Sequence, residues 1–268
     1  MVVQHNMSAM NANRMLSGVS SAQSKSTEKL SSGYRINRAA DDAAGLSISE
    51  KMRGQIRGLN QASTNAQDGI SLIQTAEGAL TEVHSMLQRM NELATQAAND
   101  TNTSTDRNAL QKEMDQLTSE IDRIRSTTQF NSMNLLDGTF KNMKLQVGAL
   151  SGQSIVISID NMNASSLKIS GLKVSSFSSA GKAMAAIQKA INSVSTQRSK
   201  LGALQNRLEH TINNLNTTSE NTSAAESRIR DVDMATEMVE YSKNNILAQA
   251  GQSMLAQANQ ATQGVLSL

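Results

Sequence analysis

The sequence predicts a mainly α fold of long antiparallel, coiled-coil-like helices, with a small β-hairpin region between them. There is no proline among the 268 residues, so nothing in the chain interrupts long helices. Apolar residues recur at alternating steps of three and four over long stretches, which is the spacing of a coiled-coil seam. The five aromatic residues would fill a compact core poorly, whereas helices packed side by side need only narrow apolar seams.

The end of the sequence, residues 244–268, contains no charged side chain and is punctuated by amides. An ordinary surface helix carries lysine and glutamate on its outer face, so we expect this helix to be enclosed by other copies or partners. The alternative is a frayed, disordered tail. The expected apolar face has spacings typical of one side of a helix and comprises Val239, Ile246, Ala250, Met254, Ala258, Ala261, Val265 and Leu268.

Residues 1–32 resemble the tail in composition, because Arg14 is the only fixed charge before Lys25, while Met7 and Met10 contribute apolar positions. We therefore expect residues 1–40 and 230–268 to pair as terminal helices and to form a core between subunits. The alternative is two independent amphipathic helices on a membrane surface. Such helices usually carry lysine and arginine on their polar face, and these do not.

Between the ends, the sequence predicts a helical rod over residues 41–229. Residues 31–59 are expected to form a joint between elements, because glycine weakens a helix and four glycines occur there: Gly33, Gly45, Gly54 and Gly58. A strong seam runs from about Gln61 to Ala98 and returns over residues 110–124 after a polar turn. This arrangement predicts an antiparallel helical hairpin.

Residues 126–180 change character and predict a β-hairpin at about 140–175. Apolar residues alternate with polar ones around Leu145 and Ile157, on either side of the glycine-containing turn GALSGQS. A further short strand is expected in the stretch LKISGLKVSSF. Helix resumes near Gly181, and its seam follows steps of seven through Ile187, Val194, Leu201, Leu208 and Leu215.

The sequence lacks the patterns of an enzyme. Its three histidines are widely separated, Asp41 and Asp42 have no third ligand at metal-binding spacing, and no phosphate-binding loop or nucleophile elbow occurs. A net charge of +2 without a basic run argues against nucleic-acid binding, and no long apolar run predicts membrane insertion. We expect no catalysis, cofactor or metal, and no secretory signal peptide.

Several long stretches resemble bacterial flagellin: LSSGYRINRAADDAAGLSISEKMRGQIRGL, NAQDGISLIQTAEGAL, LQRMNEL, GALQNRLEHTINNL and AAESRIRDVDMATEM. The short middle region resembles a minimal flagellin without a large outer insertion. The resemblance implies a secreted structural subunit that self-assembles into the extracellular flagellar filament for motility. It also implies export through the flagellar channel, with an export chaperone, filament cap and hook-junction proteins and a host Toll-like receptor as partners.

The resemblance implies roles for particular residues. Met7 and Met10 would join the tail face in filament-core assembly, and an export chaperone would mask Ile246, Met254, Leu255, Val265 and Leu266. The Toll-like receptor would contact Gln88, Arg89, Glu92, Leu93 and Glu113. The family's frequent Arg-Val-Arg-Glu-Leu is Arg-Met-Asn-Glu-Leu here, so Asn91 removes one cation from the expected receptor patch.

Two other functions are compatible with parts of the pattern. A hook–filament junction protein would resemble flagellin at its ends but diverge in the middle helices. A cytoplasmic coiled-coil signalling module of the chemotaxis-receptor kind would share the composition, but would not place charge-free helices at both ends. Filament formation after seeding distinguishes a flagellin from such a module.

Overall fold

The computed structural model describes the backbone of residues 6–266 and the side chains of residues 6–260. Over this part of the chain it contains five helices and two short antiparallel strand pairs, which confirms the mainly α fold. The chain divides into two compact units, which are Met1–Ile56 with Glu220–Leu268 and Arg57–Ser219. The first unit thus includes more of the chain than the expected terminal segments 1–40 and 230–268.

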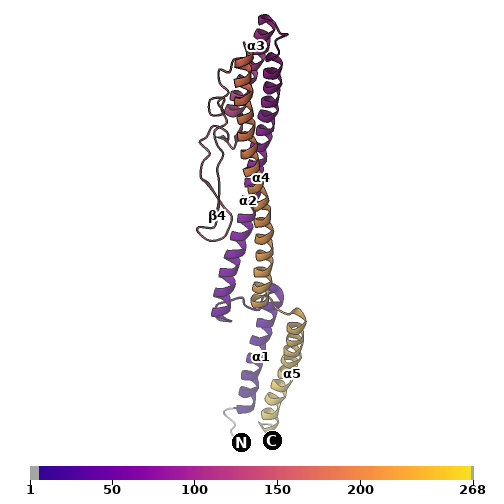
Figure 1. Ribbon diagram of the computed structural model, residues 1–268. Helices are drawn as coiled ribbons and strands as arrows, with labels where there is room; N and C mark the ends of the chain where they lie inside the picture. Colours follow the sequence, from indigo (N-terminus) through magenta and orange to yellow (C-terminus); the bar gives the residue numbers. More distant parts are fainter. Residues whose placement is uncertain (1–5, 267–268) are drawn as a thin grey trace. The chain divides into compact units, whose positions relative to one another are not determined.

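The helices are α1 (Met7–Ser32), α2 (Ala43–Ala97), α3 (Ser104–Thr127), α4 (Phe177–Arg230) and α5 (Met234–Leu266) (Figure 1). The strands are β1 (Gln129–Phe130), β2 (Met133–Asn134), β3 (Met143–Gln146) and β4 (Ser154–Ile157). In the first unit, α1 and α5 lie side by side. In the second unit, α3 and parts of α2 and α4 form a bundle, with the β3–β4 segment alongside.

The core of the second unit is formed by the seams that the apolar spacing predicts. Side chains from α2, such as Leu80 and Leu87, are fully buried together with Ile187, Val194 and Leu201 of α4. The two helices run antiparallel, because successive contacts pair later residues of one with earlier residues of the other. Three such pairs are Ser63–Asn216, Glu77–Arg198 and Thr95–Met184.

The turn between α2 and α3 is fixed by side chains that satisfy both helix ends. At the start of α3, Thr103 Oγ1 accepts a hydrogen bond from the Asp106 N–H, and the Asp106 carboxylate accepts one from the Thr103 N–H at 2.9 Å. This reciprocal capping box satisfies backbone donors that a helix start leaves free. At the end of α2, Arg107 Nε donates to the Ala97 carbonyl at 2.9 Å.

Strands β3 and β4 form the predicted hairpin, with Leu145 opposite Ile155. Ile155 and Ile157 are buried against the helices while Val156 between them is exposed, as expected for alternating sides of a strand. The hairpin lies so close to α2 that a Cβ added at Gly58 would be 2.8 Å from Ala149 Cβ. Gly58 therefore serves close packing inside a helix, so the expectation that it belongs to a joint is wrong.

The expected third strand, in LKISGLKVSSF, is absent from the described residues. Lys168 and Gly171 have φ values of 59° and 68°, which a strand cannot accommodate. Side chains of α3 hold this irregular segment instead. The Val174 N–H donates to Gln111 Oε1 and the Ala164 N–H donates to Asp122 Oδ1, each at 2.9 Å.

The joint predicted over residues 31–59 is confined to residues 33–42, because Gly45 and Gly54 lie inside α2. Gly33 ends α1 in the left-handed conformation with φ 75°, and its N–H donates to Lys29 O. A second break separates α4 from α5, between Arg230 and Met234. Tyr34 and Asp231 form an isolated β-bridge that joins the two breaks within the first unit.

We expect Gly58→Ala to destabilise the protein relative to Gly78→Ala, since the nearest atoms to a new Cβ at residue 58 include the Ala149 backbone at 3.2 Å. Gly78 also lies in α2 but has open space around it, so alanine there should stabilise by about 0.5–1 kcal/mol through helix propensity. Overpacking at residue 58 should cost about 1–3 kcal/mol. Urea unfolding of both variants checks this, and equal effects would contradict the close packing of the hairpin.

The capping box should give stability a dependence on acid pH. Hydrogen bonds from the Thr103 hydroxyl and backbone N–H lower the pKa of Asp106 below its ordinary value. The stability that the ionised Asp106 carboxylate contributes is then fully present above the unfolded-state pKa of about 3.9. It is lost as the pH falls through the folded-state pKa. The difference in urea midpoint between wild type and Asp106→Asn should therefore narrow below about pH 4. In a Thr103→Ala background, which removes the hydroxyl but keeps the backbone N–H, this pH-dependent difference should become smaller, and its persistence at full size would contradict the assignment.

Candidate assembly and recognition surfaces

Helices α1 and α5 pack along a narrow seam of mostly small and polar side chains. On α5 the shielded positions recur at steps of four and three through Glu237, Tyr241, Asn244, Ala248, Gly251, Leu255 and Ala258. On α1 they recur in the same way through Ala9, Ala12, Leu16, Val19, Gln23 and Ser26. The helices are antiparallel, because Asn6 Nδ2 donates to Ala258 O at 2.9 Å while Lys29 pairs with Glu237 at 3.5 Å.

This seam leaves the large apolar side chains of the first unit in solvent. Among the described residues of the first unit, Ile36 is the one large apolar side chain that is buried. The second unit, in contrast, buries a continuous apolar core. A soluble helix pair normally buries its apolar stripe. The exposed large apolar residues of the pair are Met7, Met10, Met15, Met234, Met238, Val239, Ile246, Leu247 and Met254.

Part of this apolar surface forms a groove of about 480 Å³ along the two helices. Met15, Leu16 and Val19 line it from α1, and Leu247 and Met254 line it from α5. No charged side chain is present among the residues that line the groove. Such a surface favours an apolar partner helix over water.

The structure divides the sequence-predicted assembly face into two parts. Met7, Met10, Val239, Ile246, Ala250 and Met254 are exposed, whereas Ala258 lies in the seam against α1. The side chains of Ala261, Val265 and Leu266, and all of Leu268, lie outside the described residues. Apolar spacing does not indicate the seam itself, because its residues are mostly small and polar, although they recur at heptad spacing.

A second surface lies on α2 and α3, where Arg89 pairs with two glutamates. Arg89 Nε donates to Glu113 Oε1 at 2.9 Å, and Nη1 donates to Glu92 Oε2 at 3.1 Å. Hydrogen bonds to Glu113 and then to Glu92 raise the pKa of Arg89 above its ordinary value. All three side chains are about half exposed or more, so this ion-pair network faces solvent.

The remaining members of the expected receptor patch differ in their placement. Gln88 is exposed and its amide lies 3.1 Å from His84 Nε2. Leu93 is fully buried in the core, so the expectation that it contacts a receptor is wrong for this conformation. Its position three residues after the buried Met90 and four before the buried Ala97 places it on the seam side of α2, which explains the burial.

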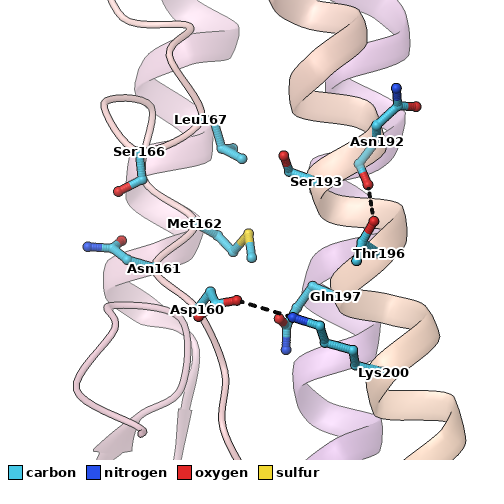
Figure 2. Close-up of a pocket in the computed structure, with 10 residues that line it drawn as sticks. All are labelled: Asp160, Asn161, Met162, Ser166, Leu167, Asn192, Ser193, Thr196, Gln197 and Lys200. Carbon is cyan, nitrogen blue, oxygen red and sulfur yellow. Dashed lines mark hydrogen bonds and ion pairs between the residues drawn. The ribbon is translucent and has the colours of Figure 1, made fainter.

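The second unit also contains a polar cavity of about 400 Å³ between the irregular segment and α4 (Figure 2). Lys200 Nζ lies 3.7 Å from Asp160, and Thr196 donates to the Asn192 carbonyl one turn away. Gln197 is buried there and its amide donates to Ser158 O at 3.3 Å. These polar side chains bond to one another and to the backbone, so we interpret them as groups that hold the irregular segment against α4.

Across the described part of the chain, no three histidine, aspartate or glutamate side chains are placed to hold a metal ion. Within the same range, no helix is long and apolar enough to cross a membrane.

Comparison with known proteins decides the family. The model of the bacterial flagellin N-terminal helical region matches residues 3–141, and that of the flagellin C-terminal helical region matches residues 184–268. The chain belongs to the bacterial flagellin family.

Individual flagellins are similar over the whole chain. A flagellin of Halalkalibacterium halodurans is 57% identical over 270 residues, covering 100% of this chain and 99% of the relative. A flagellar filament 33 kDa core protein of Treponema phagedenis is 51% identical over 284 residues, with the same coverage of 100% and 99%. The crystal structure of a Bacillus cereus flagellin matches with a TM-score of 0.52 at 34% identity, covering 61% of this chain and 94% of that chain.

Membership of the flagellin family agrees with several features of the molecule. Only residues 128–176 lie between α3 and α4, so this flagellin is of the minimal type. Flagellins are structural proteins, which agrees with the lack of catalytic patterns in the sequence. The match over the whole chain also decides against a coiled-coil signalling module.

Proposed function

We propose that this flagellin is a structural subunit of the extracellular flagellar filament and assembles through its α1–α5 pair. The observation that carries the proposal is the exposure of large apolar side chains along that pair, such as Ile246 at 66% and Met254 at 63%. Complete burial of one such side chain would stabilise the assembled state by about 1.5–3 kcal/mol. Copies of the same pair supply a matching apolar surface, so self-assembly removes the exposed faces from water.

The absence of charge suits this role. Residues 244–260 carry amides on their polar positions and no ionised side chain. An isolated charge buried between subunits would cost several kcal/mol, whereas an uncharged amide can bond to neighbouring amides or water. The charged residues of the first unit cluster instead near the breaks, for example in the bidentate contact of Arg38 with Glu28.

Met254→Lys tests assembly at one position of the exposed face. Because the side chain is largely exposed in the monomer, the substitution should leave helix content and the unfolding midpoint unchanged. Seeded filament growth should stop, since each added subunit would bury an unpaired ammonium group. Met254→Leu keeps the apolar character and should still grow filaments, as electron microscopy and sedimentation would detect. Normal filaments from Met254→Lys would mean that this face stays solvated.

The same exposed face supports the proposal of export with a chaperone. Unmasked, it would start assembly inside the cell, so a cytoplasmic export chaperone is proposed to cover Ile246 and Met254 before passage through the flagellar channel. Leu255 lies in the α1 seam and would become available only when α5 leaves α1. The filament cap and hook-junction proteins are proposed partners at the ends of the assembled structure.

Chaperone recognition can be tested with immobilised monomer and lysate from a flagellated host. Wild type should retain a small chaperone. Ile246→Lys should bind this chaperone at least about tenfold more weakly, which corresponds to about 1.4 kcal/mol. Ser242→Lys, at an exposed polar site on the same helix, serves as the control and should retain it normally. Equal recovery by wild type and Ile246→Lys would contradict the proposed contact.

We further propose that the exposed Arg89, Glu92, Glu113 and Gln88 form the contact for a host Toll-like receptor. The guanidinium is already oriented by two carboxylates, and an oriented arginine is a frequent anchor at the centre of an interface. Leu93 would act beneath this patch by fixing the path of α2, because it is buried. Asn91 in place of the family's frequent arginine lowers the positive charge of the patch.

Binding of the monomer to a receptor ectodomain tests the patch. Arg89→Ala should weaken binding by at least about fivefold, or about 1 kcal/mol. Arg123→Ala removes an arginine of similar exposure that pairs with Glu120 on α3, and it should bind as wild type does. Equal affinity of wild type and Arg89→Ala would exclude this patch. If wild type does not bind, Asn91→Arg should restore binding, and failure of both would also exclude it.

A further inference from the structure

The methionines of this chain are unevenly distributed between buried and exposed positions. Met90, Met114 and Met162 are buried in the second unit, where they fill the core. Among the residues whose side chains the structure describes, eight methionines are exposed, and only Met133 and Met143 of these belong to the second unit. The other exposed methionines all lie on the α1–α5 pair: Met7, Met10, Met15, Met234, Met238 and Met254. The chain has no cysteine, so methionine is its only sulfur-containing residue.

Two of these methionines face the apolar groove from opposite helices. Met15 of α1 is 61% exposed and Met254 of α5 is 63% exposed, and both line the groove with Leu16 and Leu247. Among the residues lining the groove, no charged group is present, and Ser8 and Asn11 are the only polar side chains. Their thioether sulfurs are thus accessible in the monomer and sit on an apolar surface.

We propose that Met15 and Met254 are a reversible oxidation site that switches the assembly competence of the monomer. The oxidant is a peroxide. The thioether sulfur attacks one peroxide oxygen, the O–O bond breaks, an S–O bond forms, and water leaves after proton transfer. The sulfur loses two electrons and the peroxide gains them. A thiol-dependent reductase reverses the step, with two thiols becoming a disulfide and the sulfoxide oxygen leaving as water.

The consequence for assembly follows from the polarity of the sulfoxide, and it rests on the filament function proposed above. A sulfoxide is a strong hydrogen-bond acceptor, and burying it in a groove lined mainly by apolar side chains costs free energy, because Ser8 and Asn11 are the only lining side chains that could donate to it. Oxidised monomer should therefore fail to bury this groove. Once the groove is covered in a filament, peroxide cannot reach the two sulfurs, so the monomer is the sensitive state.

The test uses full-length monomer treated with hydrogen peroxide and then seeded. Untreated wild type must form filaments first, and its failure would reject the filament function rather than the oxidation site. Treated wild type, with sulfoxide located at residues 15 and 254 by mass spectrometry, should elongate at least about tenfold more slowly. Methionine sulfoxide reductases of both stereospecificities with dithiothreitol should restore the rate. Normal elongation by the oxidised monomer would overturn the proposal.

Two double variants assign the effect to the groove. Met15→Leu with Met254→Leu keeps apolar side chains, so its elongation should resist peroxide. Met133→Leu with Met143→Leu removes exposed methionines of the second unit and should remain as sensitive as wild type. Equal peroxide sensitivity of the groove variant and wild type would overturn the assignment. If the groove variant does not elongate, the reductase treatment of oxidised wild type decides. Recovery of the elongation rate in step with loss of sulfoxide at residues 15 and 254 supports the site. Recovery of the rate without that loss overturns the site.

Discussion

The constraint on which the rest of this structure depends is that α1 and α5 cannot cover their own large apolar side chains. Their shared seam is made mostly of small and polar residues, among them Ser26, Asn244 and Gly251, with few large apolar ones. Small residues let two helices approach closely but bury little apolar area. Methionines and aliphatic residues remain on the outer faces, so the pair is incomplete as a folded object and gains most by association.

The second unit has the opposite character, because it buries a continuous apolar core. Its three helices bury continuous seams, and both ends of the α2–α3 turn are capped by side chains. Side chains of Gln111, Asp122 and Gln197 hold the irregular segment that follows the β-hairpin. The subunit thus combines a bundle with a buried core and a helix pair whose apolar side chains remain exposed for neighbouring copies to cover.

The sequence could predict the parts of the fold that large apolar residues dominate. The seams of α2, α3 and α4 follow from regular spacing of leucine, isoleucine and valine, and the β-hairpin follows from alternation around a glycine-containing turn. The missing strand at 167–177 had apolar alternation as well, but a positive φ at Lys168 and hydrogen bonds to α3 gave the segment another path. Tertiary contacts of this kind cannot be inferred from local pattern.

The candidate sites were predictable to different degrees. The expected apolar face of the tail contained exposed residues such as Ile246, but the inner seam was hidden because small and polar residues form it. Leu93 was assigned to a surface by motif resemblance, although its spacing from Met90 and Leu87 puts it with the buried side of α2. The sequence pattern indicated that Gly58 weakens a helix. In the structure its lack of a side chain allows Ala149 to approach α2 closely, and this contact cannot be predicted from local sequence.

Amide hydrogen exchange measured on monomer and on seeded filament tests the central claim most directly. If α1 and α5 bury too little to be stable alone, their backbone amides should exchange much faster in the monomer than the amides of α2–α4 within residues 57–219. In the filament, α1 and α5 should gain strong protection while the bundle changes little. Protection of α1 and α5 in the monomer equal to that of the bundle would contradict the claim, as would a filament in which they remain unprotected.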